Sequence, residues 1–245
     1  MKKNETPNVI ENLIPDFKNT EIISLEKQST LRRLVGSLGM LLPLLLWLIL
    51  YFNNGLLNPL DSISHYFYTR ASSIFIIVVS LLAIFLLVYK GYELIDFILS
   101  TIAGICALLL LYFPTDNITC KTLQECKSIL TKFPPENEKF RSIFHFTMAG
   151  MFLGSLALMS IFLFTKKEGD KDGFVVPELK GEKIIFVVCG VLMLLSMLMI
   201  ATNCFGVFTV DEFNDKNLTF WFEVVALEAF GFSWFVKGDV FEKNK

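Results

Sequence analysis

Charged residues and histidine are both scarce in this chain. Only 19% of its 245 residues are Asp, Glu, Lys or Arg, whereas soluble domains average roughly a quarter. Just two residues are histidine, and they show neither H-x-x-x-H nor H-E-x-x-H spacing. The net charge of −2 offers no spare basic surface, which argues against a nucleic-acid partner. No low-complexity linker divides the chain, so we expect one domain.

Long apolar runs fill the sequence instead, and 53% of all residues are hydrophobic. Each run approaches the roughly 20 residues that an α-helix needs to cross a bilayer. The sequence therefore predicts an all-α, polytopic integral membrane protein with six transmembrane helices in one bundle. The predicted spans cover about residues 34–51, 71–89, 97–113, 142–165, 184–202 and 218–236.

The distribution of Lys and Arg predicts the orientation. With the N-terminus inside, about fifteen of the 22 basic residues fall on inner segments and about seven on outer loops. An even number of spans then places both termini in the cytoplasm. We expect a multi-pass protein of the cell inner (plasma) membrane, with a cytoplasmic segment at 1–33, a transmembrane domain at 34–236 and a cytoplasmic tail at 237–245.

Five cysteines occur in the chain. Cys106 and Cys189 lie within predicted spans, where they are expected to pack as apolar residues. Cys120 and Cys126 lie six positions apart in the outer loop between the third and fourth spans, and an oxidising compartment would allow a disulfide between them. Cys204 would then be the odd thiol.

The densest polar segment runs from Asp61 to Arg70, immediately before the second span. His145 lies about one turn into the fourth span and Glu223 about five residues into the sixth, both counted from the outer side. At about 1.5 Å per residue, both lie within roughly 5–8 Å of the outer boundary. Polar groups from three segments thus converge at one depth. The candidate ligand-binding residues are Asp61, Ser64, His65, Arg70, His145 and Glu223.

Three interpretations of this convergence remain open. It can be an interfacial hydrogen-bond network in which Arg70 pairs with Asp61 or Glu223. It can recognise a lipid headgroup. It can also be catalytic, either through a zinc ion held by His65, His145 and Asp61 or Glu223, or without metal, with Asp61 orienting His65 as a general base. Because the histidine spacing is a weak metal motif, we expect no cofactor, with zinc as the alternative.

Glu228 lies near the middle of the sixth span. It is five residues from Glu223, which is about 140° around a helix, so the two carboxyl groups do not share a face. Because an acidic side chain at the bilayer centre is costly, we expect Glu228 to face the bundle, either protonated or bonded to hydroxyls such as those of Ser155 or Ser160. No chain of titratable partners lies at that depth, so we expect a structural role.

Small residues predict where helices approach closely. Gly150 and Gly154 form a G-x-x-x-G motif in the fourth span, and Gly36 with Gly39 opens the first. Such spacing lets two backbones pack together in a membrane. We expect these glycines to pack against other helices of the same chain.

Several short motifs, taken in order, carry a family resemblance. They are Arg32-Arg33, Asp61-Ser62-Ile63-Ser64-His65, Ala103-Gly104, Phe113-Pro114-Thr115 and His145-Phe146-Thr147-Met148-Ala149-Gly150. With that order the chain resembles bacterial six-span membrane proteins of unknown function similar to the DRAM- and Frag-type families. The resemblance covers roughly residues 32–165.

This resemblance implies a lipid-linked organiser, of the kind involved in glycolipid-anchor remodelling or autophagy control, rather than an enzyme. A second resemblance, to multispan hydrolases of the alkaline-ceramidase type, implies three histidines with Ser and Asp around zinc, and this chain has two histidines. We therefore expect a non-enzymatic protein that recognises lipid or organises the membrane through a polar outer-leaflet cavity. Its expected partners are membrane lipids and a membrane protein. The alternative is a metal-dependent, membrane-embedded lipid hydrolase using His65, His145 and Asp61 or Glu223.

Overall fold

The fold was analysed in a computed structural model that describes residues 22–91, 93–115, 138–166, 180–204 and 216–243. Every regular element in these ranges is helical, as predicted. Helices occupy each of the six predicted ranges, because long apolar segments satisfy their backbone hydrogen bonds internally. The elements are α2 (Ile22–Asn54), η1 (Ile63–Tyr68), α3 (Ser72–Val88), α4 (Leu94–Tyr112), α6 (Glu138–Leu158), η3 (Met159–Leu163), α7 (Lys180–Cys204) and α9 (Leu218–Lys243).

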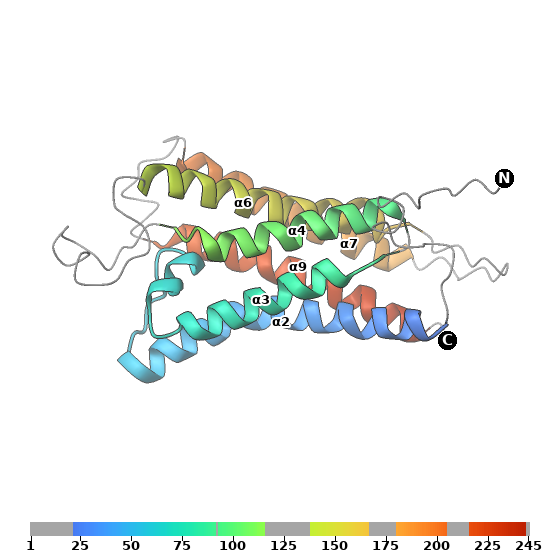
Figure 1. Ribbon diagram of the computed structural model, residues 1–245, viewed down its shortest axis with the longest axis horizontal. Helices are drawn as coiled ribbons and strands as arrows, with labels where there is room; N and C mark the ends of the chain where they lie inside the picture. Colours follow the sequence, from blue (N-terminus) through green and yellow to red (C-terminus); the bar gives the residue numbers. More distant parts are fainter. Residues whose placement is uncertain (1–21, 92, 116–137, 167–179, 205–215, 244–245) are drawn as a thin grey trace, which may run out of the picture.

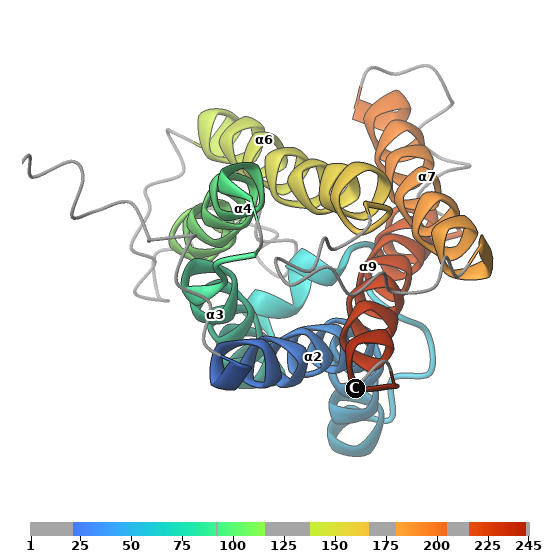
Figure 2. The same ribbon diagram turned by 90° about the vertical axis from the view of Figure 1, so that its right-hand side faces the viewer.

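The long helices form a closed ring. Seen along the bundle, α2, α3, α4, α6, α7 and α9 follow one another around it, each packed against its neighbour in the chain (Figure 2). The ring closes where α9, the last helix, packs along α2, the first. Closure ties together segments that are about two hundred residues apart: the Ser29 hydroxyl donates to the Gly238 carbonyl, 2.6 Å away.

The long helices run along the long axis of the molecule (Figure 1). η1 crosses one end, which we call the η1 end, where it contacts α2, α3 and α9. The start of α2 and the finish of α9 lie at the other end, called here the opposite end. This up-and-down arrangement brings Ser62–Tyr68 close to the first turns of α6 and α9.

Five helices are long and apolar enough to cross a membrane: Ser29–Asn54, Leu94–Tyr112, Phe140–Leu163, Gly181–Thr202 and Leu218–Gly238. The prediction of an all-helical protein with helices able to cross a membrane is therefore confirmed for the described residues. The sixth predicted span corresponds to α3, an apolar helix of 17 residues, so the count of six stays a prediction. At about 1.5 Å per residue, α3 is about 25 Å long, slightly shorter than a typical hydrocarbon core.

The outward faces of these helices are apolar. Ile84 of α3, Phe162 of η3 and Leu198 of α7 are each more than half exposed. A soluble protein rarely leaves such faces uncovered along its whole length, whereas a bilayer solvates them. The burial pattern therefore agrees with the composition in favouring a membrane-embedded bundle.

Glycine positions α2 against α9, at the seam that closes the ring. A Cβ atom on Gly36 would lie 2.5 Å from the Gly231 carbonyl oxygen, and one on Gly231 would lie 2.5 Å from that of Gly36. Gly150 and Gly154 behave differently, because an added Cβ would approach only the Met197 methyl group, at 4.0 and 3.7 Å. The glycines of both spans therefore face helices of the same chain, as expected, but the packing is tight at the first span and looser at the G-x-x-x-G of the fourth.

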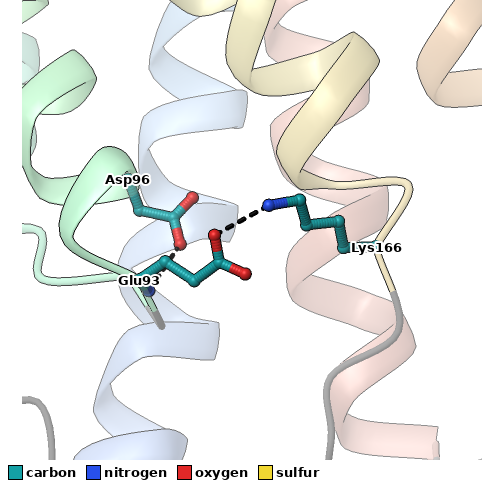
Figure 3. A network of polar contacts seen from close by, with 3 residues as sticks. All are labelled: Glu93, Asp96 and Lys166. Atoms are coloured by element: carbon teal, nitrogen blue, oxygen red, sulfur yellow. Dashed lines mark hydrogen bonds and ion pairs between the residues drawn. The ribbon is translucent and has the colours of Figure 1, made fainter.

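A polar turn joins α3 to α4 at the opposite end (Figure 3). The Asp96 carboxylate, which is buried, accepts a hydrogen bond from the Glu93 backbone N–H at 3.0 Å and caps α4. The Glu93 carboxylate in turn meets the Lys166 ammonium at 2.7 Å, with both side chains about half exposed. An ion pair this exposed adds little stability, so the buried cap is the stronger contact.

Candidate functional site

The candidate site is built on η1, a short 3₁₀-helix that begins at Ile63. Ser62 forms its N-cap, and the Ser62 hydroxyl accepts a hydrogen bond from the Ser64 N–H at 3.1 Å. The buried Tyr66 packs near the Phe220 ring of α9, with centroids 6.2 Å apart. η1 has six residues, which is long for a 3₁₀-helix, and such helices have poor hydrogen-bond geometry, so η1 depends on contacts with its neighbours.

Glu223 supplies the first of these contacts from α9. Both of its carboxylate oxygens lie 2.9 Å from the Ser62 hydroxyl, which donates to them. One oxygen also accepts the backbone N–H of Ile63. Because Ser62 and Ile63 are buried, the carboxylate satisfies two donors that water does not reach.

His145 supplies the second contact, from α6, and it is buried. Its Nδ1 lies 2.9 Å from the Phe113 carbonyl oxygen, at the finish of α4. Because a carbonyl only accepts, Nδ1 carries the proton and donates. In the neutral ring Nε2 is then an acceptor, and it lies 2.9 Å from the Ser64 hydroxyl, which donates to it.

These bonds join into one path through the η1 end. It runs from Glu223 through Ser62 and Ser64 to His145 and then to the Phe113 carbonyl. A further bond, from the Tyr68 hydroxyl to the Thr115 carbonyl at 2.7 Å, fastens the other end of η1. Side chains from the η1 segment, α6 and α9 and the backbone carbonyl that follows α4 thus meet at this end of the bundle.

His65 lies beside this path and is half-buried. Burial lowers the pKa of His65 below its ordinary value, and the nearby Asp61 carboxylate partly offsets that effect. His65 and His145 are close enough for a charge on one to act on the other. The Nδ1 atom of His65 is buried and has no hydrogen-bond partner among the described residues. An unfilled polar atom of this kind is uncommon in folded proteins and marks a place where a ligand group could bind.

Asp61 and Arg70 flank η1, and both are exposed. Within the part of the chain that the structure describes, the Arg70 guanidinium forms no ion pair, and the Glu223 carboxylate bonds to Ser62 and Ile63 instead. The expected pairing of Arg70 with Asp61 or Glu223 is therefore wrong. Asp61 and Arg70 therefore place two charges of opposite sign, not paired with each other, at the exposed rim of the site.

The zinc alternative finds no support in the described geometry. Over the described ranges, no three His, Cys, Asp or Glu side chains come together as a group that could hold a metal ion. Each ring nitrogen of His145 faces a protein partner, and Glu223 serves two donors. The presence or absence of a cofactor stays a prediction.

The cysteine predictions divide by position. Cys106 and Cys189 are buried free thiols, which agrees with their expected role in packing. The candidate disulfide between Cys120 and Cys126 lies outside the described residues. Cys204 is the last residue of α7.

Glu228 does not face the bundle. It is exposed, as are Val225 one turn before it and Phe232 one turn after it. Ser155 and Ser160, its expected partners, are buried, and the Ser160 hydroxyl donates to the Phe186 carbonyl at 2.8 Å. The prediction that the two glutamates lie on different faces of the helix is confirmed. The expected direction of Glu228 is wrong, because Glu223 points into the bundle and Glu228 points away from it.

A second polar cluster, which was not predicted from the sequence, lies at the opposite end. The Arg32 guanidinium is almost fully buried, and its Nε and Nη2 atoms donate to the Tyr89 hydroxyl at 3.1 and 2.8 Å. The Tyr89 ring packs near Trp234, with centroids 5.1 Å apart. The buried Lys237 ammonium donates to the Phe164 carbonyl at 3.0 Å. These contacts tie α2 to α3, and α9 to the end of η3.

Sequence reasoning also missed two parts of the η1 site. Ser62 was visible only as one serine in a polar run, although a serine just before a helix is a common N-cap. The Phe113 carbonyl carries no side-chain signal at all. Its role follows from the meeting of α4 and α6, which a single sequence does not reveal.

Comparison with protein-family models, with curated proteins and with solved structures gives no match. The resemblance to the DRAM- and Frag-type families stays a prediction.

Proposed function

We propose that the η1 end binds the polar headgroup of a membrane lipid and thereby lets this protein recognise or organise lipid in the membrane. The observation that carries the proposal is the buried Nδ1 of His65, left without a partner among the described residues beside an otherwise hydrogen-bonded network. A protein interior seldom leaves a polar atom unfilled unless something else reaches it.

The rim residues indicate the chemistry of the headgroup. Arg70 is exposed and free of ion pairs with described residues, and a guanidinium binds a phosphate through two parallel hydrogen bonds. Asp61 offers a carboxylate that would attract an amine. A phospholipid headgroup therefore fits better than a neutral one, with its phosphate at Arg70 and a hydroxyl or amine donating to His65.

The location supports the same assignment. The site lies at the end of an apolar bundle, where lipid headgroups meet the hydrocarbon. The positive-inside rule assigns this end to the outer leaflet. Glu223, Ser62, Ser64 and His145 hold η1 in place, so the groups that would touch lipid stand on a fixed support.

A lipid titration tests the proposal. Purified protein would be mixed with short-chain phosphatidylethanolamine, phosphatidylglycerol or the matching diacylglycerol, and thermal stability followed by intrinsic fluorescence. We expect the phospholipids to raise the Tm and the diacylglycerol to have little effect. Arg70→Gln should weaken the response on the order of tenfold, as loss of a charged hydrogen bond does.

Lys166→Gln provides the matched control. It removes one basic residue from an exposed position at the opposite end and should leave the titration unchanged. Equal stabilisation by diacylglycerol, or an undiminished response in Arg70→Gln, would contradict headgroup recognition at η1.

A second candidate function, a metal-free lipid hydrolase, is favoured by one observation. The Ser64 hydroxyl donates to Nε2 of His145 while the Phe113 carbonyl fixes the tautomer of the ring. This is how a serine nucleophile and its general base are arranged. Ser64 would attack an ester carbonyl, His145 would take its proton and pass it to the leaving alcohol, and water would release the acyl group.

A fluorophosphonate probe separates the two candidates. Covalent labelling that maps to Ser64 and disappears in His145→Ala would support the hydrolase. A protein that binds phospholipid but leaves Ser64 unlabelled would support recognition alone.

A further inference from the structure

Glu228 is the one Asp, Glu, Lys or Arg near the middle of any described span. The other charged residues of the described spans lie among the first six or the last two residues of their spans. Glu228 is ten residues from each end of the span Leu218–Gly238, which places it about 15 Å from either side. An acidic group at that depth is costly when hydrocarbon surrounds it.

Nothing in the described chain covers this side chain. Glu228 is exposed and has no hydrogen-bond partner among the residues that the structure describes. The other faces of α9 pack against α2 and α7 (Figure 2). The Glu228 face therefore looks away from the ring.

The neighbours of Glu228 form a regular stripe on α9. Trp221, Val225, Phe232 and Phe235 are 37–52% exposed, and with Glu228 they are spaced four, three, four and three residues apart. This is the spacing of the seam along which two parallel helices pack with a left-handed twist. We call these five residues the α9 stripe.

We propose that the α9 stripe is covered by the same stripe of a second copy of this chain, with the two Glu228 side chains paired at the interface. Copies inserted in the same orientation are related by a two-fold axis along the membrane normal. Such an axis places each residue opposite its own counterpart, at the same depth.

The chemistry of a carboxylic acid suits a symmetric contact. A carboxylic acid carries one O–H donor and one C=O acceptor, so two of them satisfy each other across the axis. The apolar residues of the stripe supply packing on both sides of the pair. A lipid tail could cover Val225 and Phe232, but it would leave the carboxyl group without a partner. This surface is separate from the η1 site and does not depend on its function.

Reconstitution of the full chain into liposomes tests the proposal. Dimer and monomer would be counted by single-molecule photobleaching over a series of protein-to-lipid ratios. We expect a dimer whose dissociation constant rises on the order of tenfold in Glu228→Leu. Glu228→Gln should keep it within about threefold, because an amide also has a donor and an acceptor.

Control variants fix the location of the interface. Phe232→Ala should weaken the dimer, whereas Leu195→Ala, at a slightly more exposed position on α7, should not. With all five native cysteines replaced by alanine, Val225→Cys should cross-link between copies on oxidation and Leu195→Cys should not.

A monomer at every ratio would overturn the proposal, as would a dimer that is insensitive to Glu228→Leu. A complex that Glu228→Gln abolishes would also overturn it, because that result indicates a cationic partner rather than a second copy.

Discussion

Single side chains at the η1 end combine packing with hydrogen-bond chemistry. His145 uses both ring nitrogens, donating from Nδ1 to Phe113 and accepting at Nε2 from Ser64. His65, beside it, keeps one buried nitrogen open among the described residues. Of the two histidines, His145 is thus the fixed support, and His65 is the group available to a ligand.

The lowered pKa of His65 predicts a pH-dependent stability. Because burial holds the folded pKa below the ordinary value of about 6.5, the unfolded chain binds more protons at pH values between the two. Stability contributed by the neutral ring is therefore complete above about pH 6.5 and is lost as the pH falls toward the folded pKa. The Tm should drop more between pH 7.5 and 5.5 in the wild type than in His65→Gln. The same drop in both proteins would show that other groups govern the effect.

Glu223 and Glu228 form a natural pair for mutation, since both lie on α9 and only one is engaged within the chain. Glu223→Leu leaves the Ser62 hydroxyl and the Ile63 N–H without their acceptor, at a cost of about 1–3 kcal/mol for each buried donor. We expect a clearly lower Tm for Glu223→Leu and a smaller loss for Glu223→Gln. Glu228→Gln should leave the Tm of the solubilised protein unchanged. Equal effects at both positions would contradict the assignment of their faces.

At the scale of elements, η1 and the α2–α9 seam depend on contacts between distant segments. η1 is a six-residue 3₁₀-helix held by Glu223 from α9, His145 from α6 and the Thr115 carbonyl beyond α4. The seam brings two helices together at Gly36 and Gly231. The local sequence allows the 3₁₀-helix and the close approach of α2 and α9, but contacts with neighbouring helices are needed to stabilise them.

Alanine substitutions distinguish close glycine contacts from loose ones. Gly36→Ala places a Cβ against the Gly231 carbonyl and the Phe235 backbone, and such overpacking costs about 1–3 kcal/mol. Gly150→Ala meets only the Met197 methyl group at 4.0 Å, so it should be neutral or slightly stabilising. Thermal unfolding of the two variants in detergent measures the difference. A larger loss for Gly150→Ala would contradict the ring packing.

At the scale of the whole molecule, ring closure fixes which segments share an end. α2 begins, and α9 finishes, at the end opposite η1 (Figure 1). All six long helices, α3 included, run along the bundle. The membrane topology predicted from the distribution of Lys and Arg can therefore be tested at both ends of the bundle.

A reporter fused after Lys245 should be cytoplasmic, and one inserted near Lys132 should be extracytoplasmic. Paired alkaline phosphatase and green fluorescent protein fusions measure both sites. The reverse pattern would place the η1 end in the inner leaflet, where it would meet a different set of lipids.

The sequence predicted the helices well because apolar length is a local property. It also predicted that His145, Glu223 and the Asp61–Arg70 segment lie at one depth, since depth follows from counting residues along a helix. It misplaced Glu228, because the direction in which a helix face points depends on which neighbours the helix has. The hydrogen bond to the Phe113 carbonyl and the burial of Arg32 could not be predicted for the same reason.

Binding of a phospholipid headgroup at the η1 end, as proposed, can be tested on protein taken from its own membrane. Native mass spectrometry of the wild type and Arg70→Gln, each extracted gently from its own membrane, tests it most directly. We expect phospholipid to stay on the wild type and on Lys166→Gln after the detergent is removed, and most of it to be lost from Arg70→Gln. A wild type that carries no phospholipid, or equal retention by all three proteins, would contradict the claim.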